Sequence, residues 1–287
     1  MNASTTPRAA AVQTWLITGT SSGLGRAFAE HAIARGHRVV ATARKPEALA
    51  DLVALAPDRV LALALDVTAA GAPEAAVAAA INRFGRIDVL INNAGYGVFG
   101  ALEETPDDEL RAIFDTNFFG AMAVTRAVLP VMREQRGGAI VNISSLGGQL
   151  SFGGFSAYSA TKFAIEGASE ALAQEVAPFG IKVLIVEPGQ FRTQLAGGAM
   201  RHMPILGVYE EAIGGTREFA KNMHQTQPGD PRKAAAAMER AIAAPDTPLR
   251  LQLGGDSVDA VRAHAQALLA EMAQWEPVAR GTDFDAA

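Results

Sequence analysis

The 287-residue sequence contains no cysteine, which excludes disulfide bonds, thiolate catalysis and thiolate metal ligands. Histidine is also sparse, since the chain has five: His31, His37, His202, His224 and His264. They show no HxH or HExxH spacing, so we expect no metal site. Long hydrophobic runs are missing as well, and no apolar run approaches the roughly 18 residues that a membrane-spanning helix needs.

An excess of positive charge is absent too. The formal net charge is -5 and no block of like charges stands out, so neither a nucleic-acid partner nor an anionic membrane surface is indicated. Residues 1–12 lack the continuous apolar core of a signal peptide. We interpret them as a flexible N-terminal tail and expect a cytoplasmic protein, with which the lack of cysteine is compatible.

The apolar residues that are present favour one large globular domain over residues 13–287. The composition is 49% hydrophobic and 19% charged, enough for a sizeable core. Short apolar runs alternate with helical patterns and predict strands at Trp15–Thr18, Arg38–Ala43, Leu61–Val67, Asp88–Ile91, Ala139–Ile143, Ile181–Val186 and Leu249–Leu253. The runs are continuous, as in a parallel sheet covered on both faces. The sequence therefore predicts an α/β protein with a doubly wound parallel sheet of about seven strands.

Helices are expected between these strands. One should run from Pro106 to about Arg133, with Thr105 as its N-cap, and another over residues 157–176. After Gly189 the alternation breaks, and we interpret residues 190–229 as an insertion that covers the substrate pocket. Residues 256–287 should form a C-terminal helical extension.

A phenol and an ammonium lie one helical turn apart in the stretch SAYSATK. Tyr158 and Lys162 are four residues apart, so on a helix they share one face. Tyrosine has a pKa of about 10, and a neighbouring cation lowers that value. Such a pair can do acid/base work. Taken alone it is more often a surface pair on an ordinary helix, and the motifs that accompany it favour the acid/base interpretation.

A glycine-rich turn follows the first predicted strand and opens a helix. Its pattern is Thr18-Gly19-x-x-x-Gly23-x-Gly25. The glycines permit a tight turn, and the positive end of the following helix favours a pyrophosphate. Alternatively, they serve only a tight connection.

The end of the second strand indicates which dinucleotide binds. NAD-binding proteins of this type place an acidic residue here for the ribose hydroxyls. This sequence has Ala43 followed by Arg44 and Lys45. An arginine can pair with a 2′-phosphate through parallel hydrogen bonds, so we predict NADP(H), with Arg44 as the main selector. The alternative is that both cations belong to a solvated helix start.

These motifs, with Asn92-Asn93-Ala94-Gly95, Asn117, Ser145 and Pro188-Gly189, together resemble the short-chain dehydrogenase/reductase family. The resemblance runs from about residue 13 to residue 193 and implies a Rossmann fold. The stretches VVATARKP and INNAGYG are similar to the subgroup that includes 17β-hydroxysteroid dehydrogenase-like and retinol dehydrogenase-like enzymes.

The resemblance also implies roles for individual residues. Tyr158 would protonate a carbonyl or deprotonate an alcohol, and Lys162 would lower the tyrosine pKa and hold the nicotinamide ribose. Ser145, favoured over its neighbour Ser144, would hydrogen-bond the substrate oxygen. Asn117 would hold a water that links Lys162 to solvent.

Further residues are expected to bind the cofactor. Asp66 and Asn92 would lie at its adenosine half, and Thr193 would reach the nicotinamide carboxamide. The full set of expected cofactor contacts is Gly19, Ser21, Ser22, Gly23, Leu24, Gly25, Arg44, Lys45, Asp66, Val67, Asn92, Ala94, Gly95, Tyr158, Lys162, Pro188, Gly189 and Thr193.

The resemblance thus predicts an NADP(H)-dependent oxidoreductase that interconverts an alcohol and its ketone or aldehyde. A bulky hydrophobic substrate is expected from the apolar side chains Phe152, Phe155, Met200, Met203, Ile205, Leu206 and Tyr209, which could instead be packing within the cover. The alternative function is a non-catalytic NADP(H)-binding sensor or regulatory protein. The family further implies a homodimer or homotetramer, formed through the helices at 106–133 and 157–177.

Overall fold

Seven parallel strands form the central sheet of the computed structural model, which describes residues 12–195, 197–223 and 225–284. In spatial order the strands are β3 (Val60–Ala64), β2 (Arg38–Ala43), β1 (Thr14–Ile17), β4 (Val89–Asn92), β6 (Gly138–Ile143), β7 (Ile181–Pro188) and β9 (Arg250–Leu253). The order reverses direction at β1, which pairs with both β2 and β4. The predicted doubly wound sheet is confirmed, and its crevice opens where the order reverses. The predicted N-terminal tail lies, except for Val12, outside the described residues.

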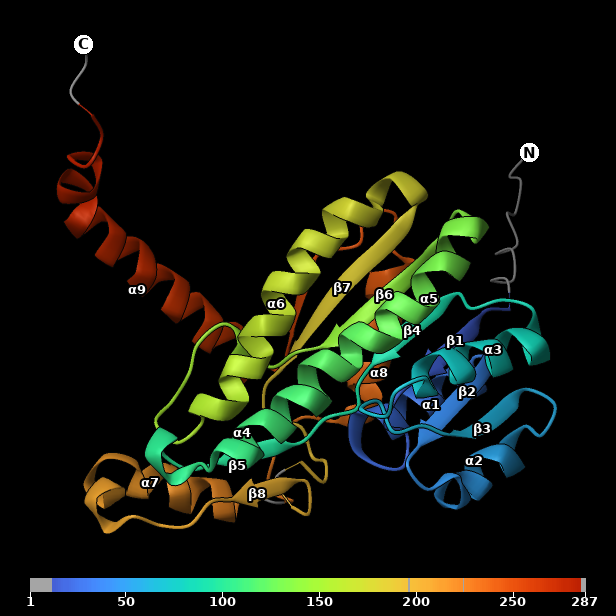
Figure 1. The fold of residues 1–287 in the computed structure, drawn as a ribbon, viewed down its shortest axis with the longest axis horizontal. Helices are drawn as coiled ribbons and strands as arrows, with labels where there is room; N and C mark the ends of the chain where they lie inside the picture. The colour runs from blue at the N-terminus through green and yellow to red at the C-terminus, as the bar shows by residue number, and fades with distance from the viewer. Residues whose placement is uncertain (1–11, 196, 224, 285–287) are drawn as a thin grey trace, which may run out of the picture.

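Helices cover both faces of this sheet (Figure 1). They are α1 (Gly23–Ala34), α2 (Ala50–Leu55), α3 (Ala72–Phe84), α4 (Asp107–Phe114), α5 (Ala121–Gln135), α6 (Ser156–Val176), α7 (Glu210–Asn222), α8 (Pro231–Ala243) and α9 (Gly255–Arg280). Helices α1, α2 and α8 pack on one face, and α3, α5 and α6 on the other. Within the described ranges no helix is both long and apolar enough to span a bilayer.

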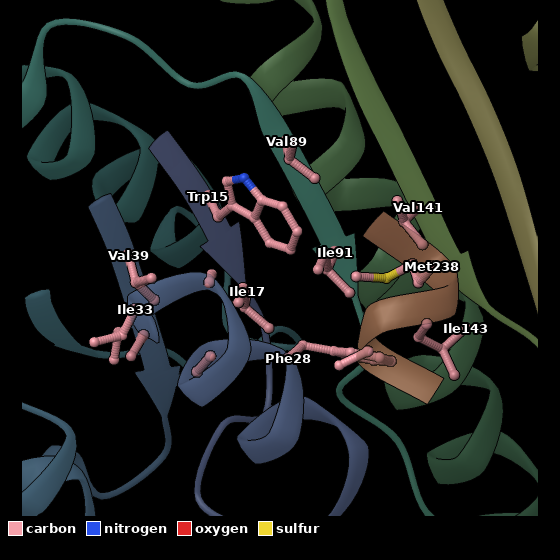
Figure 2. Close-up of a cluster of buried hydrophobic side chains, with 14 of the residues drawn as sticks. Trp15, Ile17, Phe28, Ile33, Val39, Val89, Ile91, Val141, Ile143 and Met238 are labelled. Carbon is pink, nitrogen blue, oxygen red and sulfur yellow. The ribbon is translucent and has the colours of Figure 1, made fainter. Parts of the chain in front are cut away.

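Successive strand side chains point to opposite faces and build two buried cores. Trp15 belongs to the core under α1 and α8, whereas the next residue, Leu16, belongs to the core under α3 and α5. Figure 2 shows the first core, in which Phe28 of α1 and Met238 of α8 lie against the strand side chains. Since both faces are buried, the strands are apolar throughout, as the sequence indicated.

The predicted helix from Pro106 to Arg133 is interrupted. Helix α4 ends at Phe114, a wider π-helical turn spans Asp115–Gly120, and α5 then continues the rod. Thr105 is not the N-cap, because the extended Pro106 takes that position. The π turn holds Asn117 inside the protein, where its amide finds backbone partners.

The segment 190–229 leaves the sheet and returns to it. Gly229 N donates to the Gln190 carbonyl at 3.0 Å, which joins the two ends of the segment. Within it, β8 (Met200–His202) pairs in parallel with β5 (Gly97–Phe99), a small second sheet that the sequence did not predict. We call residues 190–229 the cover.

A buried ion pair also attaches the cover to the rest of the protein. The buried Arg217 of α7 donates two hydrogen bonds, each 2.9 Å, to the carboxylate of Glu104, which lies in the 3₁₀ turn Leu102–Glu104. The same carboxylate accepts from the backbone N–H of Leu206 at 2.8 Å. Because both partners of this ion pair are buried, it holds α7 in one position against the body.

Candidate active site

Tyr158 and Lys162 occupy successive turns of α6, and both are buried. The Lys162 ammonium donates to the Ile143 carbonyl at 2.9 Å, at the carboxyl end of β6. It lies 5.6 Å from the centre of the Tyr158 ring. The helical spacing read from the sequence therefore brings the phenol and the cation together at the end of the sheet where ligands bind.

Burial is the largest cause of the pKa shifts of both Tyr158 and Lys162. It raises the pKa of the Tyr158 phenol, and the hydrogen-bonding hydroxyl of Ser145 opposes it. Burial also lowers the pKa of Lys162 to about 8, against the attraction of Glu166. The tyrosine pKa is thus raised and not lowered as expected, because loss of solvent outweighs the hydrogen bond from Ser145.

The two serines after β6 have different surroundings. Ser145 lies beside the Tyr158 phenol, and its Oγ accepts from the Gly147 N–H at 3.0 Å. The Ser144 hydroxyl instead lies beside Glu166, whose pKa is raised by burial, and opposes that rise. This arrangement favours Ser145 over Ser144 as the group that meets a substrate oxygen.

Asn117 lies in the π turn with both ends of its amide engaged. Its Oδ1 accepts from the Tyr96 N–H at 3.0 Å, while Nδ2 donates to the Tyr96 carbonyl at 3.0 Å and to Thr161 Oγ1 at 3.2 Å. Thr161 precedes Lys162 on α6. Asn117 therefore joins the chain after β4 to the helix that carries the reactive pair; the water-holding role expected for it stays a prediction.

The glycine-rich turn forms the opposite end of the site. Gly23 has φ +62°, a left-handed conformation that suits glycine. A Cβ at Gly25 would collide with the Asn93 side chain and the Gly19 carbonyl. No side chain caps the start of α1, because the N-cap residue Ser22 makes no such bond, so the first N–H groups of the helix are open to a ligand.

One cavity of about 510 Å³ connects these parts. Fifteen of the expected cofactor-contact residues line it: Gly19, Ser21, Ser22, Gly23, Leu24, Arg44, Asp66, Val67, Ala94, Gly95, Tyr158, Lys162, Pro188, Gly189 and Thr193. Ser145 also lines it. The geometry thus places the glycine turn, Arg44 and the reactive pair around one shared space.

Three predicted cofactor residues, Gly25, Lys45 and Asn92, do not line the cavity. Gly25 packs against the Asn93 side chain and the Gly19 carbonyl. Lys45 is exposed and leads into the next turn of chain. Asn92 is buried, and its Nδ2 donates to Thr125 Oγ1 and Asn142 Oδ1, both at 2.8 Å. These partners hold Asn92 within the protein interior, so its contribution is to the framework below the site.

Asn93 and Thr18 were missing from the predicted contacts. Thr18 Oγ1 accepts from the N–H groups of Asn93 and Ala94, both at 2.9 Å, and Asn93 Nδ2 donates to the carbonyls of Thr18 and Gly19. Together they join the ends of β1 and β4 under the cavity. Both lie inside motifs visible in the sequence, but nothing local to them indicates their partners.

The apolar residues expected to form a substrate pocket lie elsewhere. Phe155 and Met203 pack with Tyr158 and Val98 in a buried cluster, and Phe152 is half exposed. None of the seven residues assigned to the pocket from the sequence lines the cavity. Other side chains that line it are mixed in character, among them Tyr96, Ala112, Thr116, Gln194, Leu195, Ala199 and Arg201.

Two buried carboxyl groups, those of Glu166 and Glu187, lie behind Lys162. Glu166, one turn beyond Lys162, accepts from Arg250 Nε at 2.9 Å, and the fully buried Glu187 accepts from Gln149 at 3.1 Å and Gln252 at 2.7 Å. Burial, with the nearby Glu166 charge, raises the pKa of Glu187 to about 7. A carboxylic acid that holds its proton near neutrality therefore lies close to the site.

The residues present fit a nicotinamide dinucleotide. Glycine at position 25 lets β1, α1 and the end of β4 approach closely, and the uncapped start of α1 suits a pyrophosphate. A tyrosine, lysine and serine face the far end of the same cavity. Fold and site together define a dinucleotide-dependent oxidoreductase.

Comparisons with known proteins agree with this class. The family described as short chain dehydrogenase matches residues 13–203, and the chain belongs to that family. It is 41% identical over 262 residues to oxidoreductase BOA17 of Botryotinia fuckeliana, covering 91% of this chain and 96% of that protein. It is 40% identical over 241 residues to a 3-ketodihydrosphingosine reductase of Bacteroides thetaiotaomicron, covering 83% and 87%. The crystal structure of a short-chain dehydrogenase from Streptomyces avermitilis aligns with a TM-score of 0.90 and 54% identity, covering 95% and 99%.

Proposed function

We propose that this protein is an NADP(H)-dependent oxidoreductase that interconverts an alcohol with its ketone or aldehyde, using Tyr158 as the acid/base. The observation that carries the proposal is the opening of Tyr158, Lys162 and Ser145 into the cavity that begins at the glycine turn. When bound, the nicotinamide supplies or accepts the hydride. The chain itself has to orient the substrate and move one proton.

Each group has a distinct task in that proton movement. Ser145 holds the substrate oxygen close to the Tyr158 phenol, which gives or takes the proton. Lys162, fixed by the Ile143 carbonyl, supplies the positive charge that favours the phenolate. Burial of all of these groups except the more open Ser145 strengthens their electrostatic interactions.

Preference for NADP(H) is supported by the residue at the end of β2. Arg44 is exposed and lines the cavity, and it is close enough to Asp66 to lower the pKa of that carboxyl. The Asp66 carboxylate is itself occupied by the hydroxyl of Thr68 at 2.7 Å and its N–H at 3.0 Å. A guanidinium free to reach a 2′-phosphate is therefore available where NAD-binding relatives need a carboxylate.

Arg44→Asp tests this preference. The ratio of kcat/KM for NADPH to that for NADH should fall by roughly 100-fold, the effect of replacing an attractive charge with a repulsive one next to a phosphate. Lys45→Asp is the matched control, because it makes the same charge change one residue away, outside the cavity. An unchanged ratio in Arg44→Asp would contradict the proposal.

We further propose a bulky, largely apolar carbonyl substrate. Leu195, Ala112 and Tyr96 line the same cavity as Tyr158, and Arg201 is a polar residue of that lining. The 40% identical relative is named as a 3-ketodihydrosphingosine reductase, so its name specifies a keto compound as substrate. Turnover confined to small polar carbonyls would contradict this substrate class.

The enzyme proposal is tested by NADPH and NADH oxidation with a panel of hydrophobic and small carbonyl compounds. Tyr158→Phe should lower kcat by about 10²–10⁴-fold, the usual contribution of a positioned acid/base. Tyr209→Phe, at a half-buried tyrosine of the cover that does not line the cavity, should retain activity. Tight NADPH binding with no turnover across the panel would favour the sensor reading instead.

The remaining proposals concern organisation. We propose that residues 190–229 form the substrate-binding cover and that residues 256–287 form a C-terminal extension of one domain. We also propose a cytoplasmic homo-oligomer. Exposed Phe119 of the π turn and Phe163 of α6, 57% and 47% exposed, support assembly through the helices named from the sequence. The mass in solution tests the assembly.

A further inference from the structure

Helix α9 carries an apolar seam that is half-buried at its base, at Val258 and Val261, and that no other described part of the chain covers beyond Val261. Its members recur at alternating spacings of three and four residues: Val258, Val261, Ala265, Leu268, Met272, Trp275 and Ala279. This is the a/d spacing of a heptad repeat, the pattern of helices that pair side by side. Leu268, Met272 and Trp275 are 50%, 59% and 61% exposed.

The helix extends away from the body of the protein (Figure 1). Its base is anchored, since Ser257 Oγ donates to the Glu187 carbonyl at 2.9 Å and Asp256 accepts from the Gln190 N–H at 2.7 Å. From Arg262 to Arg280 every residue is exposed. Helices in proteins gain most of their stability by packing an apolar face, and this stretch packs none of its own against the described chain.

The polar face of α9 argues against a membrane as the covering surface. Between Asp256 and Arg280 it carries four acidic and two basic residues. Helices that lie on membranes are instead rich in lysine and arginine on that face. The narrow seam with its 3.5-residue period fits another helix better than a broad lipid surface.

We infer that α9 of one chain packs along this seam against α9 of a second copy of the same chain, with the two helices antiparallel. Charges flanking the seam select the direction. A parallel pair would set Glu271 beside Glu276 of the second copy, on both sides. An antiparallel pair that crosses near Leu269 sets Arg262 beside Glu276 of the second copy, again on both sides, and leaves one Glu271 pair of like charge.

The area available suits such a pair. Two Trp275 side chains would remove roughly 300–500 Å² from water, since an aromatic side chain buries about 150–250 Å². With both copies of Leu268, Leu269 and Met272 added, the total approaches the ~1,200 Å² at the lower end of stable interfaces. The seam is symmetric about its crossing point, as a two-fold dimer contact requires.

The first test compares the mass of the full-length protein with that of two variants by sedimentation equilibrium. Leu268→Glu/Met272→Glu places two charges in the seam, and its dissociation constant should rise at least about 100-fold. Ala263→Glu/Ala270→Glu adds the same charge to the opposite face and should match the unsubstituted protein. Thermal unfolding of the core checks that all three are folded. Equal dissociation constants for the two variants would overturn the inference.

The second test uses the absence of native cysteine. Under mild oxidation Leu269→Cys should give a disulfide-linked dimer, because Leu269 meets its own copy at the crossing point, whereas Val261→Cys should not. The reverse result would indicate a parallel pair and overturn the antiparallel inference. Cross-linking no greater than that of Ala263→Cys, on the outer face, would overturn the pairing itself.

The third measurement separates a second copy from other covering surfaces. The chain has two tryptophans, and Trp15 is fully buried, so Trp275→Phe supplies the background to subtract. Trp275 emission should shift to the blue as protein concentration rises. A blue emission independent of concentration would show packing within one chain, and a shift that requires vesicles of anionic lipid would show membrane binding. Either result would contradict the inference.

Discussion

The Lys162 ammonium is fixed by a 2.9 Å hydrogen bond to the Ile143 carbonyl while it lies 5.6 Å from the centre of the Tyr158 ring. Strand β6 therefore sets the position of the cation, and helix α6 sets the distance from cation to phenol. A change at either element should alter proton transfer without touching the cofactor-binding turn.

Lys162→Met should lower kcat by roughly 100-fold or more, because it removes the buried cation beside the acid/base. Burial lowers the pKa of Lys162 to about 8, so the protonated form is lost as pH rises through that value. The pH profile of kcat/KM should therefore lose an ionisation near pH 8 in the variant, although Tyr158 and Lys162 titrate as a coupled pair. Lys233→Met, at an exposed position of α8, is the control.

Gly25→Ala should destabilise the protein by about 1–3 kcal/mol, because the added methyl group meets the Asn93 side chain and the Gly19 carbonyl. The same displacement should weaken NADPH binding. Gly167→Ala is the matched control: it lies on the exposed side of α6 with open space around it, and it should stabilise that helix by up to ~1 kcal/mol. Chemical denaturation and NADPH titration measure the two effects.

Glu187→Gln should change how stability depends on pH. The folded pKa of Glu187 is about 7, above the ordinary 4.5, so the folded state binds more protons than the unfolded state between these values. The stability that Glu187 contributes to the folded state is complete below pH 4.5 and is lost as pH rises through 7. The wild-type free energy of unfolding should fall by about 3 kcal/mol over this range through this group, and less in the variant. Glu170→Gln, which removes an exposed partner of Arg250, should retain the fall.

Arg217→Met should lower the free energy of unfolding by about 3–5 kcal/mol, because it leaves the Glu104 carboxylate buried without its cation. The double variant Glu104→Gln/Arg217→Met should recover part of the loss. If the loss of unfolding free energy in the double variant equals the sum of the losses in the two single variants, the two side chains do not act as a pair. Arg232→Met, at the exposed start of α8, should have little effect.

The reactive pair and the glycine turn could be predicted because their signals are local. Four residues of helix bring Tyr158 to Lys162, and three glycines between an apolar run and a helical pattern define the turn. Asn92 was assigned to the cavity in place of Asn93 because successive strand residues face opposite ways. The side that each one faces depends on where β4 ends, and the apolar run alone does not fix that residue.

Long-range contacts could not be predicted. Strands β5 and β8 are three residues each and about a hundred residues apart, too short to give a periodic signal. The π turn that buries Asn117 adds one backbone position within a continuous helical pattern. Its cause is tertiary, since the amide binds the Tyr96 backbone and Thr161.

Tyr96 is held from two directions. Asn117 binds its backbone, and Arg201 of β8 lies 4.2 Å from the centre of its ring while pairing with Glu109 at 2.7 Å. If β8 moves outward to admit a substrate, Arg201 must either leave the ring or pull on the loop that Asn117 steadies. Asn117 is in turn bonded to the neighbour of Lys162. An outward movement of β8 would therefore be transmitted through Tyr96 and Asn117 to the helix that carries Tyr158 and Lys162.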